Sequence, residues 1–236
     1  MTSFFDNSFL RLSEDFYYEI KPEKMPSPEI IKINQSLAEK LNFNEKYLNK
    51  DYLSGNKLIS GSKQFAQKYA GHQFGNFVPN LGDGRAIMLG EIIDNQKKRQ
   101  DIQLKGSGKT PFSRMGDGRA GLGPVLREYL VSESMHYLGI PSTRSLAILL
   151  TGEKIIRENV QPGALLVRVA SSHIRIGTFE YFAYKNDVKN IKKLADYCIE
   201  RHYPKINKKN KYLNFLQSVT ERQALLISKW MGVGFV

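Results

Sequence analysis

Cysteine is almost absent from the sequence, and no long hydrophobic run occurs in it. The single cysteine, Cys198, excludes an intrachain disulfide and a cysteine-based metal site, and is typical of a small buried apolar residue. The four histidines lack the spacing of a zinc site. No run of about 18 apolar residues and no basic-then-apolar leader is present, so we expect neither a membrane span nor a secretory signal. These absences favour a reducing, cytoplasmic location.

The composition favours a folded domain that binds an anion. Hydrophobic residues make up 41% of the 236 positions and aromatic residues 11%, which is enough for a buried core. The 35 lysines and arginines exceed the 23 aspartates and glutamates, giving a net charge of +12. Such a balance suits nucleic acid, an acidic membrane surface or a phosphorylated ligand. We do not expect nucleic acid, because the chain has neither an aromatic ladder nor a recognisable reading helix.

The sequence of the first part of the chain is typical of an extension followed by a β-rich region. Residues 1–60 are rich in aromatic residues and prolines, and a helix is expected over residues 28–41. Apolar runs at residues 86–93 and 101–104 predict two strands joined by a polar turn at residues 94–100. A stretch rich in glycine, serine and arginine follows at residues 106–123.

The second part begins with a helix and ends with helices. Pro124 suits the first turn of a helix, which Gly139 ends. Two strands are expected at residues 145–150 and 164–170, the second continuing towards residue 177. Helices are expected at residues 188–201 and 214–231, the last with Phe215, Val219, Ile227 and Trp230 in the core. The pattern predicts an α+β fold in which a mostly β lobe precedes the start of a helical lobe.

A short glycine motif occurs twice. Gly82-Asp83-Gly84-Arg85 directly precedes the first strand of the predicted hairpin, and the same four residues recur at residues 116–119. Glycines let a backbone approach a ligand closely, and arginine binds phosphate oxygens in a fork. One copy is weak evidence, because Asp-Gly is common in turns. Two copies flanking a hairpin favour polyphosphate binding without excluding two ordinary turns.

A lysine and a glutamate follow in an order that resembles kinase-like nucleotide sites. Lys105 ends the returning strand, and Glu128 lies in the second turn of the next helix. A carboxylate partner keeps a flexible lysine charged and aimed at a phosphate. Each residue taken alone is better explained by a surface ion pair. The order of glycine turn, strand, strand lysine and helix glutamate favours the nucleotide interpretation.

The segment Gly106-Ser107-Gly108-Lys109-Thr110 looks like the end of a P-loop but fails the test of context. The motif requires a glycine where Gln103 stands and a helix that starts at the Lys-Thr pair, whereas Pro111 follows immediately. We therefore exclude a P-loop.

Two arginines flank the end of the last predicted strand. Arg168 and Arg175 are seven residues apart, so an unbroken strand would place them on opposite faces. Ser171-Ser172-His173 is expected to break the strand, which would let both arginines reach one anion. Two unrelated surface arginines remain the alternative. His173 is interpreted as a polar loop residue and not as a catalytic base.

These motifs together resemble the selenoprotein O family, whose members are pseudokinase-like proteins that transfer AMP from ATP to protein hydroxyls. The resemblance covers about residues 5–236 and is carried by residues 69–75 (YAGHQFG), 81–86 (LGDGRA), 104–108 (LKGSG), 110–114 (TPFSR), 116–120 (GDGRA), 127–128 (RE) and 138–141 (LGIP). It implies a protein-kinase-like fold that binds ATP in a flipped orientation, with the α-phosphate facing the acceptor.

The resemblance also assigns roles to individual residues. It implies that Lys105 reaches the phosphates and that Glu128 positions it. It implies nucleotide contacts for Gly82, Gly84, Arg85, Asp117, Gly118, Arg168 and Arg175. No catalytic residue and no metal ligand is assigned within the chain: the family's catalytic aspartate and Mg²⁺ ligands are expected beyond Val236. Without them, we expect residues 1–236 alone to be inactive or severely impaired.

The expectations for the whole protein follow from the same resemblance. We expect ATP and Mg²⁺ as cofactors and proteins with Ser, Thr or Tyr hydroxyls as partners, with no membrane partner. The expected organisation is an extension (1–60), a kinase-like nucleotide-binding lobe (61–180) and the start of a truncated helical lobe (181–236). A non-catalytic nucleotide-binding fragment, an ordinary protein kinase and a basic nucleic-acid-binding module remain the alternatives.

Overall fold

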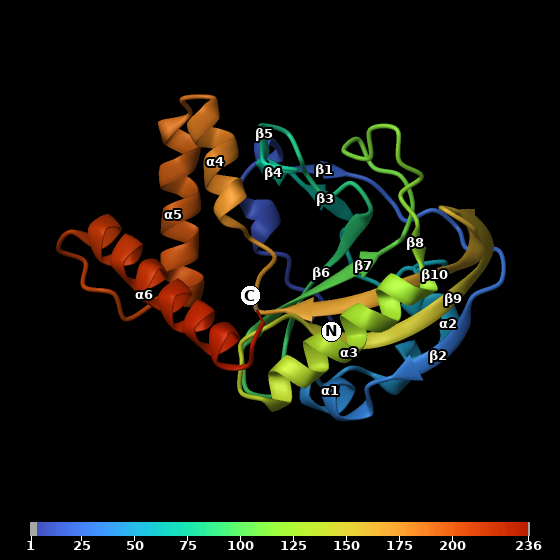
Figure 1. Cartoon of the computed structure of the whole chain (residues 1–236). Helices are drawn as coiled ribbons and strands as arrows, with labels where there is room; N and C mark the ends of the chain where they lie inside the picture. Colours follow the sequence, from blue (N-terminus) through green and yellow to red (C-terminus); the bar gives the residue numbers. More distant parts are fainter. Residues whose placement is uncertain (1–3, 236) are drawn as a thin grey trace.

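An eight-stranded antiparallel sheet forms the centre of the structure, a computed structural model that describes residues 4–235 (Figure 1). Its strand order is β1 (Tyr17–Glu19), β3 (Phe65–Gln67), β6 (Ala86–Ile93), β7 (Arg99–Lys105), β10 (Val160–Ala170), β9 (Arg144–Ile156) and β2 (Glu29–Ile33), and β8 (Ala120–Gly121) pairs with β10. A separate hairpin consists of β4 (Gly71–Gln73) and β5 (Asn76–Val78).

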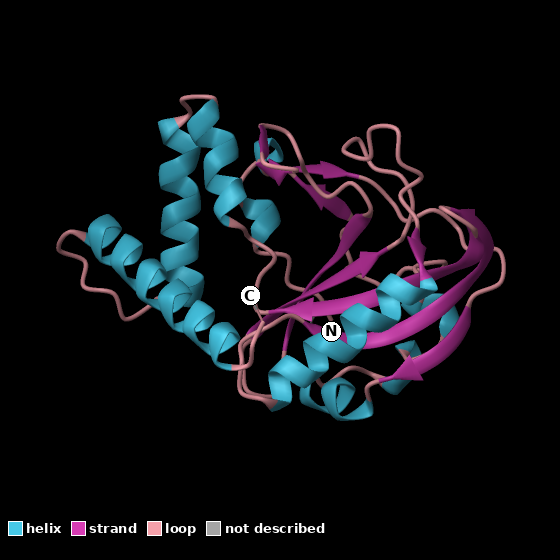
Figure 2. Ribbon diagram, viewed as in Figure 1, coloured by secondary structure: helices cyan, strands magenta, loops and turns pink. Residues whose placement is uncertain are grey.

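Helices lie on both faces of this sheet and at one end of it, as the colouring by secondary structure shows (Figure 2). They are α1 (Gln35–Lys40), α2 (Lys50–Leu53), α3 (Leu122–Tyr137), α4 (Ile176–Tyr184), α5 (Val188–His202) and α6 (Lys211–Gly232). Three short 3-10 turns lie at Phe9–Arg11, Glu14–Phe16 and Glu45–Tyr47. The structure is therefore mixed α and β, with an antiparallel sheet.

Both faces of the sheet are covered, which explains why β6 and the middle of β10 are mostly apolar. Alternate residues of β10 point to opposite faces. Leu165 and Val167 pack with α1 and α2 in one core, and Leu166 packs against Val125 of α3 in another. Figure 1 shows α3 lying along β9 and β10. The helix α3 is thus fixed on the face of the sheet where polar residues of β7 and β10 also point.

The helices α4, α5 and α6 gather at one end of the sheet (Figure 1). Phe182 of α4 and Leu194 of α5 are buried with Phe16 and Phe65 in a third core. No described residue of α6 is buried. The expectation that Ile227 lies in the core is wrong, since its side chain is 49% exposed. Phe215 reaches Phe179 and Tyr203 but stays half-buried, as do Val219 and Trp230.

Two other sequence expectations need correction. The first half of the helix expected at residues 28–41 is strand β2, and the helix α1 begins only after Asn34, whose side chain accepts from the backbone N–H of Leu37 at 3.2 Å. The apolar residues that suggested one helix belong to two elements, β2 and α1, which pack against the same core. The last strand ends at Ala170, and Gly177 lies in α4, which the sequence analysis did not predict.

The strands predicted at residues 86–93, 101–104, 145–150 and 164–170 are present, the last three in longer form. The helix that Gly139 ends and the two later helices are also confirmed. Within residues 1–60, β1 and β2 are strands of the main sheet. Among residues 4–235, no helix has the length and apolar character needed to cross a membrane.

Candidate nucleotide-binding site

A cleft of about 700 Å³ opens between the two Gly-Asp-Gly-Arg turns. The first turn is held by β6, which follows it directly, and the second lies in the loop between β7 and β8. The cleft is rich in cations from both turns and from three strands or strand ends. Its basic lining residues are Arg85, Lys105, Arg114, Arg119, Arg157, Arg168 and Arg175.

The strand register brings Lys105 and Arg168 to one side of the sheet. Lys105 pairs with Leu166, and Arg168 pairs with Gln103. Directly paired residues of antiparallel strands share a face, and Leu166 packs towards α3, so all four point to this helix. Glu128 of α3 meets them there: its carboxylate accepts from the Lys105 ammonium through Oε2 and from Arg168 Nε through Oε1. The contact expected between Lys105 and Glu128 is therefore present.

This cluster carries more positive than negative charge. One carboxylate serves two cations, and the remaining bond of the Arg168 guanidinium goes to the neutral Gln103 Oε1 at 3.2 Å. Burial and the neighbouring Arg168 lower the pKa of Lys105. Burial alone would raise the pKa of Glu128, but the hydrogen bonds and charges of Arg168 and Lys105 outweigh it and lower that pKa. Glu128 stays ionised and fixes the two cations, which line the cleft while Glu128 itself lies behind them.

The first Gly-Asp-Gly-Arg turn has a buried aspartate and a free arginine. Asp83 is 2% exposed and accepts from the Tyr69 hydroxyl at 3.0 Å and from the Gln67 backbone N–H at 3.1 Å. Burial raises the pKa of Asp83, although the charge of Arg175 opposes this. Arg85 lines the cleft, is exposed, and has no ion pair among the described residues. In this copy the aspartate supports the fold and the arginine is available to a ligand.

The glycines of the first turn are required by the neighbouring loop. Gly82 has a φ of +56°, and a Cβ there would lie 2.2 Å from the Phe112 ring. A Cβ on Gly84 would lie 2.8 Å from the Phe112 carbonyl oxygen. Both glycines line the cleft, but their small size is already explained by packing against Phe112. Their contact with a nucleotide stays a prediction.

The second turn reverses the roles of its charged residues. Asp117 is partly exposed and receives both terminal nitrogens of Arg157, at 2.8 and 2.9 Å. These hydrogen bonds lower the pKa of Asp117. Arg119 is mostly buried and pairs with Glu153 at 2.7 Å and Glu23 at 3.0 Å. The identical sequences therefore present a free arginine in one turn and a paired one in the other.

Arg157 is a cleft residue that the sequence analysis missed. It lies just beyond β9, in the hairpin that connects β9 to β10, and donates to Asp117 through both terminal nitrogens. Its neighbours in sequence form no recognisable motif. Its place at the cleft follows from the pairing of β9 with β10, which the sequence does not show. Gly118, next to Asp117, has a φ of +68° and packs against the backbone of Gly108.

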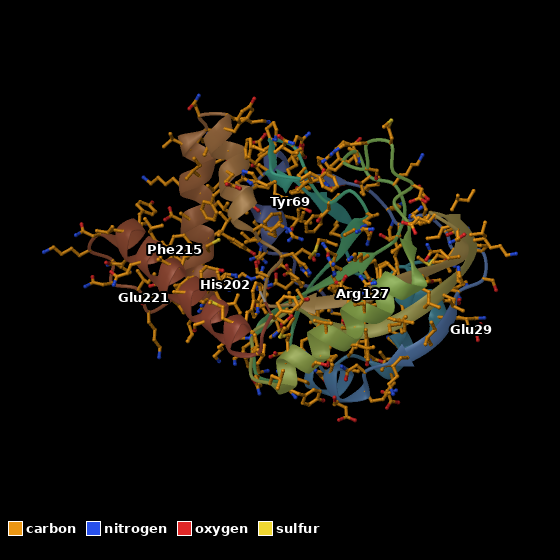
Figure 3. All side chains as sticks on the ribbon, viewed as in Figure 1. Glu29, Tyr69, Arg127, His202, Phe215 and Glu221 are labelled. Atoms are coloured by element: carbon orange, nitrogen blue, oxygen red, sulfur yellow. The ribbon has the colours of Figure 1, made fainter. Side chains whose placement is uncertain are left out.

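Arg175 reaches the cleft from the segment after β10. The strand ends at Ala170, as expected from Ser171-Ser172-His173, and both Arg168 and Arg175 line the cleft. The Arg175 guanidinium lies 4.8 Å from the centre of the Tyr69 ring, which Figure 3 labels. Their convergence on one cleft is confirmed, and their contact with an anion stays a prediction.

His173 differs from the expected polar loop residue because it is buried. It is 5% exposed, and its backbone N–H donates to Asp101 Oδ2 at 2.8 Å. The ring Nδ1 lies 3.3 Å from the same oxygen. Asp101 also accepts from Arg201 at 2.6 Å, so His173 belongs to a buried ionic network between the sheet and α5. Cys198 is buried as predicted, and burial raises the pKa of its thiol to about 12.

The donor set within the described residues suits phosphate and not a metal ion. Between residues 4 and 235, no group of three or more His, Cys, Asp or Glu side chains is arranged to hold a metal. The acidic residues at the cleft are already occupied: Asp83 by buried hydrogen bonds, Asp117 by Arg157 and Glu128 by two cations.

Comparison with known proteins identifies relatives over the whole chain. A family model described as "Protein adenylyltransferase SelO" matches residues 1–236. A "Protein nucleotidyltransferase YdiU" from Rhizobium rhizogenes is 55% identical over 236 residues, covering 98% of this chain and 47% of the relative. Relatives with the same name from Rhodopseudomonas palustris and Rhizobium meliloti are 54% and 53% identical, with 98% and 100% of this chain and 48% and 49% of the relatives covered. The chain thus spans about half the length of these curated relatives, and it belongs to the SelO family.

Proposed function

We propose that the protein is an ATP-dependent protein adenylyltransferase, which transfers AMP to the hydroxyl of Ser, Thr or Tyr in other proteins. The observation that carries the proposal is the cationic cleft. Lys105 and Arg168 share one carboxylate, while Arg85 and Arg175 have no ion pair among the described residues. Four cations against one carboxylate leave an excess of positive charge that suits a triphosphate.

The proposed reaction breaks the bond between the α-phosphorus and the oxygen that bridges it to the β-phosphate. The acceptor hydroxyl oxygen forms the new bond to the α-phosphorus, its proton passes to a base, and pyrophosphate leaves. Charge accumulates on the leaving pyrophosphate as this bond breaks. Lys105 and Arg168, held in place by Glu128, would stabilise that charge without reorganising. Gly82, Gly84, Asp117 and Gly118 would line the remainder of the nucleotide site.

We place the catalytic aspartate and the Mg²⁺ ligands outside residues 1–236. Mg²⁺ would supply charge neutralisation at the phosphates, and the described residues offer no metal-binding cluster. We also propose a protein-kinase-like fold, a cytoplasmic location, and the division into 1–60, 61–180 and 181–236. The absence of a metal cluster among residues 4–235 favours a second candidate for this segment alone, a nucleotide-binding unit without activity.

The test uses the complete gene product with ATP labelled at either the α- or the γ-phosphate. Label from the α-phosphate, and not from the γ-phosphate, should appear on protein. Lys105→Ala should reduce this transfer by more than about tenfold, equivalent to about 1.4 kcal/mol of barrier. The matched control is Lys109→Ala, because Lys109 is an exposed lysine in the neighbouring loop. This variant should transfer AMP at the wild-type rate. Transfer of the γ-phosphate would instead indicate a kinase, and normal transfer by Lys105→Ala would refute the role of this lysine.

A further inference from the structure

Two apolar side chains stand fully exposed beside the cleft. Phe74 is 101% exposed at the tip of the β4–β5 hairpin, and Met115 is 102% exposed in the loop between β7 and β8. Figure 1 shows the hairpin and this loop rising on the same side of the molecule. Arg114 joins them by donating from Nη1 to Gln73 Oε1 at 2.8 Å. The two apolar tips are therefore held next to one opening.

Phe74 is unfavourable for the fold in two ways. Gln73 pairs with Asn76, so Phe74 and Gly75 form a two-residue turn, with φ values of +50° and +78°. Such turns favour Asn-Gly, because a bulky residue is strained at positive φ. The ring also contributes no burial, and a Cβ on Gly75 would meet nothing within 4 Å. A strained residue that adds nothing to the core points to a role in binding.

The apolar surface continues from the hairpin to α4. Phe77 of β5 is 39% exposed, and its ring centre lies 5.8 Å from that of Tyr184, which is 62% exposed. We call the exposed side chains Phe74, Phe77, Met115 and Tyr184 the mouth surface. Its members come from the β4–β5 hairpin and from its two neighbours, since the hairpin contacts the loop of Met115 through Gln73 and Arg114 and contacts α4 through Phe77 and Tyr184.

The nucleotide does not account for most of this surface. Met115 lines the cleft, but Phe74, Phe77 and Tyr184 do not, so a nucleotide held there would not touch these three aromatic side chains. A polypeptide that reached the cleft from outside would cross them. Arg114, which has no role in the proposed nucleotide site, lines the same opening and has no ion pair among the described residues. Apolar side chains beside an arginine without an ion pair complement a segment that carries both apolar and acidic residues.

We propose that the mouth surface binds the polypeptide segment that presents the acceptor hydroxyl, and that this segment carries apolar residues next to acidic ones. The identity of the segment as an acceptor rests on the proposed function. Its binding does not, because docking requires only the mouth surface.

The test measures binding and transfer separately in the complete gene product. The probe is a short fluorescent peptide with one serine flanked by Leu, Phe and Glu residues. One control peptide replaces Glu by Lys, and another replaces Leu and Phe by Ser. The test variants are Phe74→Asn and Met115→Gln. The control variant is Leu213→Gln, because Leu213 is an exposed apolar residue of α6. Peptide Kd is read by anisotropy, nucleotide Kd with a fluorescent ATP analogue, and KM and kcat by α-phosphate label.

Wild type and Leu213→Gln should bind the acidic, apolar peptide at least about tenfold more tightly than either control peptide. Phe74→Asn should raise the peptide Kd and KM by at least about tenfold and leave nucleotide Kd and kcat unchanged. Met115→Gln should also raise the peptide Kd by at least about tenfold. Phe74→Asn should keep or raise the melting temperature, since asparagine suits positive φ, so lost binding is not lost folding.

Equal peptide binding by wild type and Phe74→Asn, no peptide binding by wild type, or a Phe74-dependent dimer in sedimentation would each overturn the proposal. If the peptide binds as expected but receives no AMP, the docking surface stands and the proposed reaction fails.

Discussion

Glu128 is the residue on which the geometry of the candidate site depends. It lies on α3 behind the cleft and accepts from cations of two different strands, Lys105 of β7 and Arg168 of β10. A carboxylate shared in this way fixes both cations while neutralising only one of the two charges. The sequence analysis predicted the Lys105 contact but left Arg168 without a partner, because pairing between β7 and β10 is a long-range feature.

Arg168→Ala should weaken nucleotide binding by more than about tenfold, or about 1.4 kcal/mol, because it removes one of the cations that face the phosphates. Isothermal titration with ATP measures this change. Arg127→Ala is the control, since Arg127 is exposed and adjacent to Glu128 on the same helix (Figure 3), and its ATP affinity should equal that of wild type. Unchanged affinity in Arg168→Ala would remove this arginine from the site.

His202 gives the fold a dependence on pH that one substitution can test. It lies where α5 meets α6 (Figure 3), and burial, aided by the charge of Arg201, lowers its pKa from 6.5 to about 4. Between these values the unfolded chain binds a proton that the folded chain does not, so acid favours unfolding. The stability linked to His202 is complete above about pH 6.5 and is lost as pH falls towards 4.

His202→Gln should therefore lose less stability than wild type when pH is lowered from 6.5 to 4. Urea unfolding at several pH values measures the slope, and the same measurement above pH 7 gives the baseline difference between the two proteins. Parallel curves for the two proteins would contradict the assignment.

At the scale of elements, short sequence patterns predicted the helices and strands that are determined by neighbouring residues, but not those that depend on distant parts of the chain. The glycine turn, β6, β7 and α3 were predictable, because apolar runs and the Pro124 and Gly139 signals are local. The strand β2 was mistaken for helix because Ile30 and Ile31 precede α1 at nearly helical spacing. The short strands β3, β4 and β5 have three residues each, too few for a period to be visible.

The two Gly-Asp-Gly-Arg turns illustrate the same limit within the site. Their sequences are identical, yet Asp83 is buried and Asp117 is paired with Arg157 at the surface. Which member of each turn faces the cleft depends on the elements packed against it. Phe112 fills the space over the first turn, and the β9–β10 hairpin supplies Arg157 to the second. The sequence analysis could locate the turns but could not distinguish them.

Gly118→Ala tests how tightly the second turn is constrained. A Cβ there would lie 2.1 Å from the Gly108 backbone, at a φ of +68° that alanine rarely adopts. The substitution should destabilise the fold by more than about 1 kcal/mol and displace the loop that carries Asp117. Gly123→Ala is the matched control: nothing lies within 4 Å of its Cβ, and in the first turn of α3 it should stabilise by about 0.5–1 kcal/mol. Thermal unfolding measures both, and equal effects would show that the loop is free to adjust.

At the scale of the whole molecule, a buried ionic network joins the amino-terminal arm, the sheet and the helices. Arg201 of α5 donates to Asp101 of β7 at 2.6 Å and to Glu91 of β6 at 3.1 Å. Glu91 also accepts from the Ser8 hydroxyl at 2.6 Å, and Asp101 accepts from the His173 backbone. The side chains of Arg201, Asp101 and Glu91 are at most 5% exposed. Each charge therefore needs its partners to offset the free energy of hydration that it loses on burial.

Arg201→Met should destabilise the protein by about 3–5 kcal/mol, because it leaves buried Asp101 without its arginine partner and leaves buried Glu91 with Arg99 alone. Those carboxylates would take up protons to escape the penalty, so the loss should be smaller at pH 5 than at pH 8. Lys193→Met, at an exposed position of the same helix, should change stability by less than about 0.5 kcal/mol. Urea unfolding at both pH values measures these differences. A loss below about 1 kcal/mol for Arg201→Met would mean that water reaches the network, and the link between α5 and the sheet would then rest on apolar contacts such as those of Leu194 and Cys198.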